Sequence, residues 1–179
     1  MTTTLAIQSP AAALSAYWRT VTGLLGHPRR FFGDLPETLD LRQSACFLGL
    51  SAILHATLAL IYARPANPLT VGGTLLLNAV GMVGLLTVLG CLLASISGRP
   101  RVRLAGLFHI YALSSGVVLL GSWLPAALVY TEIWKWWLIG TGMTTGLGFR
   151  WYRSLAIIGV SVLTTVLLFH WLLSTGVPS

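Results

Sequence analysis

Five long apolar runs, separated by short segments that hold almost all of the charge, most constrain what this chain can become. The runs cover approximately residues 43–63, 70–97, 104–122, 133–149 and 154–173. Each has about the length that an α-helix needs to cross a bilayer. None alternates polar and apolar residues as a barrel strand does. The sequence therefore predicts an all-α integral membrane protein with five transmembrane helices.

The low charge content excludes an ordinary soluble domain. Only 8% of the 179 residues are charged and 55% are hydrophobic, whereas soluble domains carry about 25% charged residues. In a soluble protein, the net charge of +7 would raise nucleic acid as a partner. Here the arginines stand at the ends of apolar runs. We attribute them to membrane topology and anionic lipid headgroups, and we expect no nucleic-acid partner.

The placement of arginine predicts the orientation of the five helices. Residues 104–149, for example, lie between the arginine tracts 99–103 and 150–153. With five crossings, nine arginines fall on one side of the membrane, and only Arg64 and Lys135 fall on the other. The positive-inside rule then places the N-terminus in the cytoplasm and the C-terminus across the membrane.

An amphipathic helix is expected before the first crossing. Residues 1–42 form a cytoplasmic N-terminal segment, residues 43–173 the membrane domain and residues 174–179 a short tail. Within the first segment, apolar residues recur at helical spacing and polar residues fall on another face. The apolar ones are Leu14, Tyr17, Trp18, Val21, Leu24 and Leu25. This helix is too short to span, so we expect it to lie in the interface; the alternative is that it packs on the membrane domain.

A basic and aromatic segment follows this helix. Pro28 breaks the helix, and the next residues are Arg29, Arg30, Phe31 and Phe32. The two arginines suit the headgroup region, and the two phenylalanines can insert below them. Together with the Trp18 side chain, these residues are the expected interaction surface of the segment.

Polar residues inside the apolar runs are the candidates for chemistry. A rise of about 1.5 Å per residue places His55 and Asn78 at similar depths on adjacent antiparallel helices, so we predict a hydrogen bond between them. His109 lies nearer the cytoplasmic end, and His170 nearer the outer surface. Each histidine is most simply a neutral, hydrogen-bonded imidazole.

Two alternatives give these polar residues a direct function. In a small-solute channel or permease, a polar path would run between the first two crossings. Its lining would be His55, Asn78, Gly81, Gly84 and Thr87. In a haem b-bearing electron-transfer subunit, His55 and His170 would be the axial ligands.

Nothing in the sequence predicts catalysis. It contains no HExxH, GxSxG or Walker A motif. All four acidic residues lie at or outside the ends of the apolar runs, which argues against a coupled transporter because ion relays need carboxylates in the membrane core. Cys46 and Cys91 lack metal-type spacing, and Glu132 and Lys135 are interpreted as an interfacial pair. We therefore expect a non-enzymatic protein with no cofactor and no metal.

A pair of glycines marks a close approach of helices. Gly142 and Gly146 form a GxxxG motif in an apolar run. Such a face lets a second helix pack closely against the backbone. We favour packing within the helix bundle over a dimer interface.

Several loose motifs form a wider pattern. Trp18 precedes the segment His27–Phe32 on the approach to the first crossing. The third apolar run is centred on Tyr111 and is followed by Trp123–Pro125, and Trp134–Gly140 leads to the arginines before the last run. Together with the five-crossing layout, this pattern resembles the Yip family, the Ypt/Rab-interacting-protein type of membrane domain.

The resemblance implies a membrane protein without enzymatic activity. The richness in Ala, Leu, Gly and Arg indicates a bacterial source, so we expect a multi-pass protein of the cell inner membrane. We carry over the fold and not the vesicle-traffic role of the eukaryotic relatives. The expected function is that of a structural or accessory subunit of a larger membrane complex, or a role in membrane organisation. The expected partners are the lipid bilayer, with anionic lipids at the cytoplasmic face, and other membrane protein subunits.

Overall fold

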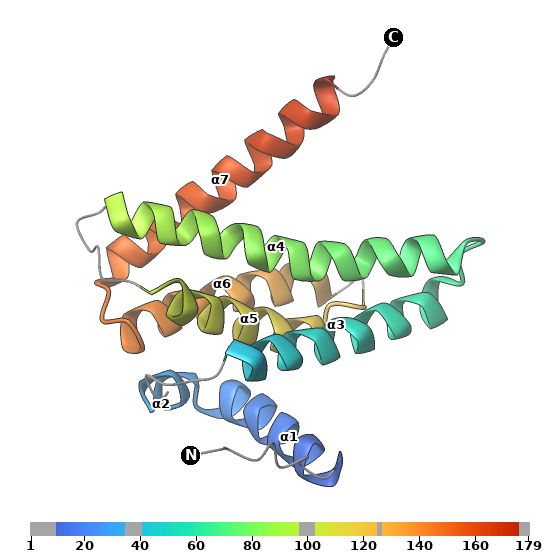
Figure 1. Ribbon diagram of the computed structural model, residues 1–179, viewed down its shortest axis with the longest axis horizontal. Coiled ribbons are helices and arrows are strands. Elements are labelled where there is room, and N and C mark those ends of the chain that lie inside the picture. The colour runs from blue at the N-terminus through green and yellow to red at the C-terminus, as the bar shows by residue number, and fades with distance from the viewer. Residues whose placement is uncertain (1–9, 35–40, 97–102, 125–126, 176–179) are drawn as a thin grey trace, which may run out of the picture.

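The computed structural model describes residues 10–34, 41–96, 103–124 and 127–175, and these residues hold seven α-helices and no strand. The helices are α1 (Pro10–Gly26), α2 (Pro28–Gly33), α3 (Leu41–Ala63), α4 (Pro68–Ile96), α5 (Leu104–Leu119), α6 (Leu128–Thr145) and α7 (Trp151–Thr175). The predicted all-α fold is confirmed (Figure 1). The predicted N-terminal helix is also present, as α1.

Three helices are long and apolar enough to cross a bilayer: α3, α4 and the Trp151–Trp171 part of α7. The expected third and fourth crossings correspond to the shorter helices α5 and α6, of 16 and 18 residues. At 1.5 Å per residue, α5 is about 24 Å long, less than a hydrocarbon core of about 30 Å. These features are those of a helical membrane protein. The count of five crossings stays a prediction.

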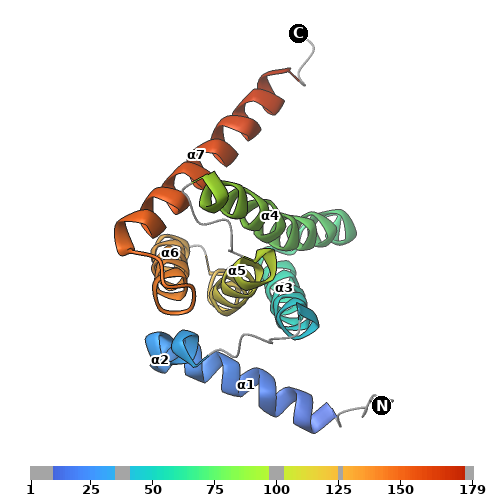
Figure 2. The same ribbon diagram turned by 60° about the vertical axis from the view of Figure 1, so that its left-hand side comes forward.

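Helix α5 is the centre of the bundle. It contacts α3, α4 and α6, and every residue from His109 to Val118 is buried. A helix that is apolar around its whole circumference needs neighbours on all sides. Figure 2 shows α5 between these three helices, with α1 and α2 on one side of the bundle and α7 on the other.

The packed faces of the long helices mix small or hydroxyl side chains with a few large apolar ones, and the outer faces carry mainly large apolar side chains. On α3 the buried residues include Ser44, Ser51, Ala52 and Ala56. The exposed ones include Leu50, Ile53, Leu54, Leu58 and Ile61. In lipid there is no hydrophobic force between helices, so association depends on close packing and hydrogen bonds. This distribution fits a helix that meets hydrocarbon outside the bundle.

Helix α7 packs on α4 and α6 along its first part, where Ser154, Ser161 and Thr165 are buried. Its last part projects away from the bundle (Figure 1). There the side chains from Val166 to Trp171 are exposed, on every side of the helix. Apolar exposure around a whole helix fits hydrocarbon and not water.

Chain reversals bring most of the described arginines to one end of the bundle. The start of α5, the end of α6 and the start of α7 lie at the same end as the end of α4 (Figure 1). Arg103 and Arg150 are exposed there, and α2 adds the exposed Arg29 and Arg30. Arg64 follows α3 at the opposite end. The two ends of the bundle therefore differ in their content of described arginines.

Candidate functional site

Helix α1 is docked on the bundle through one face. Tyr17, Val21 and Leu24 are buried. The Tyr17 hydroxyl lies 2.9 Å from Ser51 Oγ on α3, and the Tyr17 ring lies 4.9 Å from the ring of Phe47. The packing on the membrane domain that the sequence left as an alternative is therefore present. Its position relative to the lipid interface stays a prediction.

A second face of α1 is apolar and exposed. Leu14, Trp18 and Leu25 are 59%, 54% and 51% exposed. Successive residues turn by about 100° around a helix, so these three side chains form a stripe directly beside the buried face. We call them the α1 stripe. The polar Ser15 and Arg19 lie on the next sector, so α1 presents the bundle, an apolar surface and a polar surface in turn.

Helix α2 packs against Gly142 and Gly146 at the end of α6. We call the gap that these two glycines leave the glycine notch. The Phe32 side chain is 1% exposed. A methyl group at Gly142 would come within 3.2 Å of the Phe32 ring and 2.7 Å of Ile110, and one at Gly146 would come within 3.3 Å of the Phe32 carbonyl oxygen. Within the molecule, the GxxxG face is therefore approached by helix α2 and by Ile110 of α5.

Phe31 fastens α2 to α1. A methyl group at Gly23 of α1 would lie 2.8 Å from the Phe31 ring, and the Phe31 and Phe32 rings meet edge to face with centroids 5.8 Å apart. The two phenylalanines thus point to different neighbours. Instead of both inserting into lipid, as the sequence led us to expect, one packs on α1 and the other is buried against α6.

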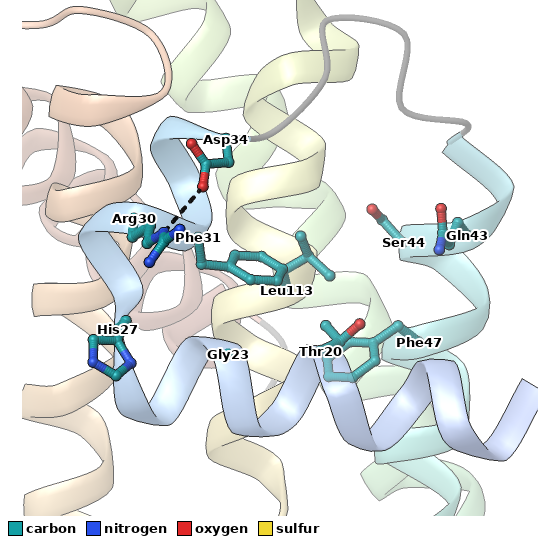
Figure 3. Close-up of a pocket in the computed structure, with 10 residues that line it drawn as sticks. All are labelled: Thr20, Gly23, His27, Arg30, Phe31, Asp34, Gln43, Ser44, Phe47 and Leu113. Carbon is teal, nitrogen blue, oxygen red and sulfur yellow. Dashed lines mark ion pairs between the residues drawn. The ribbon is translucent and has the colours of Figure 1, made fainter.

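A cleft of about 550 Å³ lies between α1, α2, the start of α3 and α5 (Figure 3). We call it the N-terminal cleft. Its apolar lining is Phe31, Phe47 and Leu113. Its polar lining is Thr20, His27, Arg30, Asp34, Gln43 and Ser44. The volume is in the usual range of small-molecule sites, about 300–1,000 Å³.

Opposite charges face each other at this cleft. Arg30 Nε lies 3.6 Å from Asp34 Oδ2, and the two side chains are 84% and 74% exposed. An exposed pair at this distance contributes about 0–1 kcal/mol to stability. Both groups can therefore exchange their mutual contact for a bound ligand at little cost.

His109 lies behind the wall of the cleft. Its Nδ1 is 2.6 Å from the hydroxyl oxygen of Ser44, and both side chains are buried. The predicted hydrogen-bonded imidazole is present. Its partner on α3 was not foreseen, because 65 residues separate the two positions and no local motif connects them.

The predicted hydrogen bond between His55 and Asn78 is wrong. His55 Nδ1 lies 3.2 Å from the carbonyl oxygen of Leu119 and 3.1 Å from Ser122 Oγ, at the end of α5. Equal depth in the membrane does not determine the direction in which a side chain points around its helix. Helix α5 packs against both α3 and α4, so it offers each of them another partner. His55 therefore meets α5, whereas Asn78 is exposed on α4.

The structure does not bring together the two histidines proposed as haem ligands. His55 meets the end of α5, and the exposed His170 lies in the projecting part of α7. Within the described residues, no group of three His, Cys, Asp or Glu side chains is placed to hold a metal ion.

A second pocket, of about 290 Å³, lies among α4, α5, α6 and α7. We call it the α4–α7 pocket. Its polar lining is Asn78, Ser115, Ser122, Glu132, Lys135 and Thr165. Lys135 Nζ lies 2.6 Å from Glu132 Oε2 and 4.7 Å from the centroid of the Trp136 ring, and its side chain is only 17% exposed. The predicted interfacial pair is thus an ion pair at a pocket wall.

Of the five residues predicted to line a channel, the lining of the α4–α7 pocket includes only Asn78. Thr87 is buried and donates its hydroxyl to the Val83 carbonyl in its own helix. The polar volume is on the side of α4 that faces α5, α6 and α7. No residue of α3 is in this lining, and α3 packs directly on α4.

Comparison of this chain with protein-family models, with curated proteins and with solved structures finds no match in any of the three.

Proposed function

We propose that this chain is a non-enzymatic, multi-pass protein of the bacterial inner membrane, of Yip-like type, that acts as a structural or accessory subunit of a larger membrane complex or organises the lipid around it. Five crossings with a cytoplasmic N-terminus are part of the proposal. The gathering of Arg29, Arg30, Arg103 and Arg150 at one end of the bundle supports that orientation, and anionic lipid is the expected partner of that end.

The α1 stripe carries the functional part of this proposal. Leu14, Trp18 and Leu25 remain exposed although the adjacent face of the same helix is docked. Burying a large apolar side chain is worth about 1.5–3 kcal/mol, so water is an unfavourable neighbour for all three. The contacts of Tyr17 with Ser51 and Phe47 fix the rotation of α1, which holds the stripe away from its own bundle. Such a surface serves for contact with lipid or with another subunit.

Purification from native membranes in a mild detergent, followed by mass spectrometry, tests the accessory role. We expect a co-purifying membrane protein or a tightly held lipid. Replacing both Trp18 and Leu25 by Ser should release the co-purifying component, whereas Thr22→Ser on the polar side of α1 should retain it. A monodisperse monomer without bound protein or lipid would contradict the proposal.

The α4–α7 pocket favours a second candidate function, that of a small-solute channel or permease. Its polar groups come from four helices and lie beside apolar ones such as Val83 and Leu86, as in sites that admit a polar solute into a membrane domain. Flux into liposomes decides between the two functions. If the chain conducts, Asn78→Leu should abolish flux and Ser95→Leu, at the other end of α4, should not. Absence of flux for the unaltered chain would remove this candidate.

A further inference from the structure

We propose that the N-terminal cleft binds one zwitterionic phospholipid with a primary ammonium headgroup, of the phosphatidylethanolamine type. Its phosphate would contact Arg30, its ammonium Asp34, and an acyl chain the apolar lining. The inference rests on the proposed membrane function, because it takes the cleft to lie at the lipid interface. Beyond that function, the inference assigns a binding site, a class of headgroup, and Asp34 as the residue that selects this headgroup.

The lining of the cleft is divided as an amphiphile requires. Phe31, Phe47 and Leu113 form the apolar lining and come from three elements, and in Figure 3 the Phe31 side chain points toward Leu113. The charged groups stand at another edge, where Arg30 and Asp34 face each other. A soluble polar ligand would leave the apolar side wet, and a bare hydrocarbon would leave the charges without partners. A phospholipid can place an acyl chain on the apolar lining and its headgroup at the charged edge.

The paired charges select the headgroup. Among the described residues that line the cleft, Asp34 is the one carboxylate, and it stands 3.6 Å from Arg30. A purely anionic headgroup would gain from Arg30 and be repelled by Asp34. A headgroup with both a phosphate and an ammonium gains from both residues, because the phosphate is attracted to Arg30 and the ammonium to Asp34. A choline headgroup has no N–H to donate to the carboxylate, so a primary ammonium is preferred.

Neutral polar groups and a fixed frame complete the site. Gln43 supplies an amide donor from α3, and the Thr20 hydroxyl, which donates to the Ala16 carbonyl oxygen of α1, can accept a hydrogen bond. The frame does not depend on the ligand, because Phe32 is held at Gly142 and Tyr17 at Ser51. A pre-formed pocket avoids the ordering cost of binding.

Native mass spectrometry of the purified full chain, incubated with equal amounts of phosphatidylethanolamine, phosphatidylglycerol and phosphatidylcholine, tests the proposal. We expect one retained phosphatidylethanolamine. Arg30→Gln and Asp34→Asn should each weaken its binding about tenfold, the effect of losing one charge-assisted hydrogen bond. Asp34→Asn should also raise the ratio of retained phosphatidylglycerol to phosphatidylethanolamine. Arg29→Gln, an equal loss of charge on α2 outside the cleft, should change nothing.

A larger side chain that leaves the charge unchanged tests whether the lipid binds in the N-terminal cleft. Thr20→Trp fills the cleft from α1 and should abolish retention, whereas Thr22→Trp makes the same change on the polar side of that helix and should not. Equal retention by both tryptophan variants, equal retention of phosphatidylglycerol by the unaltered chain, or no effect of Asp34→Asn would each overturn the proposal. So would binding of glycerophosphoethanolamine, the headgroup without acyl chains, as strongly as the lipid.

The experiments distinguish a failure of the proposed lipid site from a failure of the proposed accessory function. If phosphatidylethanolamine is not retained but a membrane protein still co-purifies, the cleft assignment fails and the accessory role stands. If the lipid is retained at the cleft and the Trp18 and Leu25 double variant co-purifies the same proteins as the unaltered chain, the role of the α1 stripe fails and the lipid site stands.

Discussion

Helices α1 and α7 lie on opposite sides of the bundle. Helix α1 is the less apolar of the two, yet it is packed on the bundle, whereas the last part of the more apolar α7 projects from it. The α1–α2 unit is fixed by the Tyr17 contacts and by Phe32 in the glycine notch of α6. The last turns of α7 are apolar from Val166 to Trp171 except for His170, and they are exposed on every side. On α3 and α7, the exposed faces carry large apolar side chains, whereas the packed faces hold serine, threonine and alanine beside a few large apolar residues.

The same contrast divides α7 internally. Its first part buries Ser154, Ser161 and Thr165 against the bundle. Each of the latter two hydroxyls bonds a carbonyl oxygen within the helix, at 2.7 and 2.8 Å. The second part offers only bulky side chains from Val166 to Trp171, and it leaves the bundle (Figure 1). The packed part of α7 therefore differs from the projecting part by its buried hydroxyl residues, although it also buries Ile157 and Ile158.

Removing the side chain that fills the notch should give the largest effect. Phe32→Ala should lower the free energy of unfolding by about 3–4 kcal/mol, because it empties a fully enclosed site. The matched variant Phe169→Ala, on the exposed part of α7, should change it by less than about 0.5 kcal/mol. Denaturant unfolding in detergent measures both. Equal losses for the two variants would break the comparison between α1–α2 and α7.

Filling the notch should come next. Gly142→Leu should cost about 2–3 kcal/mol, since a side chain there overlaps Ile110 and the Phe32 ring. Gly159 of α7 has no atom within 4 Å of an added methyl group, so Gly159→Leu should be nearly neutral. Thermal stability in the same detergent serves as the measurement. If Gly142→Leu unfolds like the unaltered chain, the close-approach face has been misassigned.

Loss of one buried hydrogen bond should have a smaller effect. Tyr17→Phe should lower stability by about 1 kcal/mol, because it leaves the Ser51 hydroxyl without this partner. Tyr62→Phe, at an exposed position on α3, provides the control and should be silent. Amide hydrogen exchange of α1 should increase in the first variant alone. Unchanged exchange in both variants would show that the hydrogen bond does not hold α1.

Part of this architecture could be predicted from the sequence. Apolar runs indicate the long helices, the spacing of Tyr17, Val21 and Leu24 indicates α1, and the GxxxG motif indicates a notch filled from within the bundle. Each of these is a local pattern whose period or spacing has a direct structural meaning.

The pairings that build the site could not be predicted. Ser44 meets His109, and His55 meets Ser122, across 65 and 67 residues. Helical rise gives the depth of a residue but not the direction in which its side chain points. That direction depends on which helix occupies the centre, and no local signal identified the short helix α5 as that centre.

The central claim is that α1 presents three surfaces at once: the bundle, an apolar stripe and a polar face. Photo-crosslinking in intact membranes from a reactive side chain at position 18 or at position 22 tests it most directly. We predict crosslinks from position 18 to lipid or to another membrane protein, and none from position 22. Equal crosslinking from both positions, or crosslinks from position 18 only to the chain's own helices, would contradict the account.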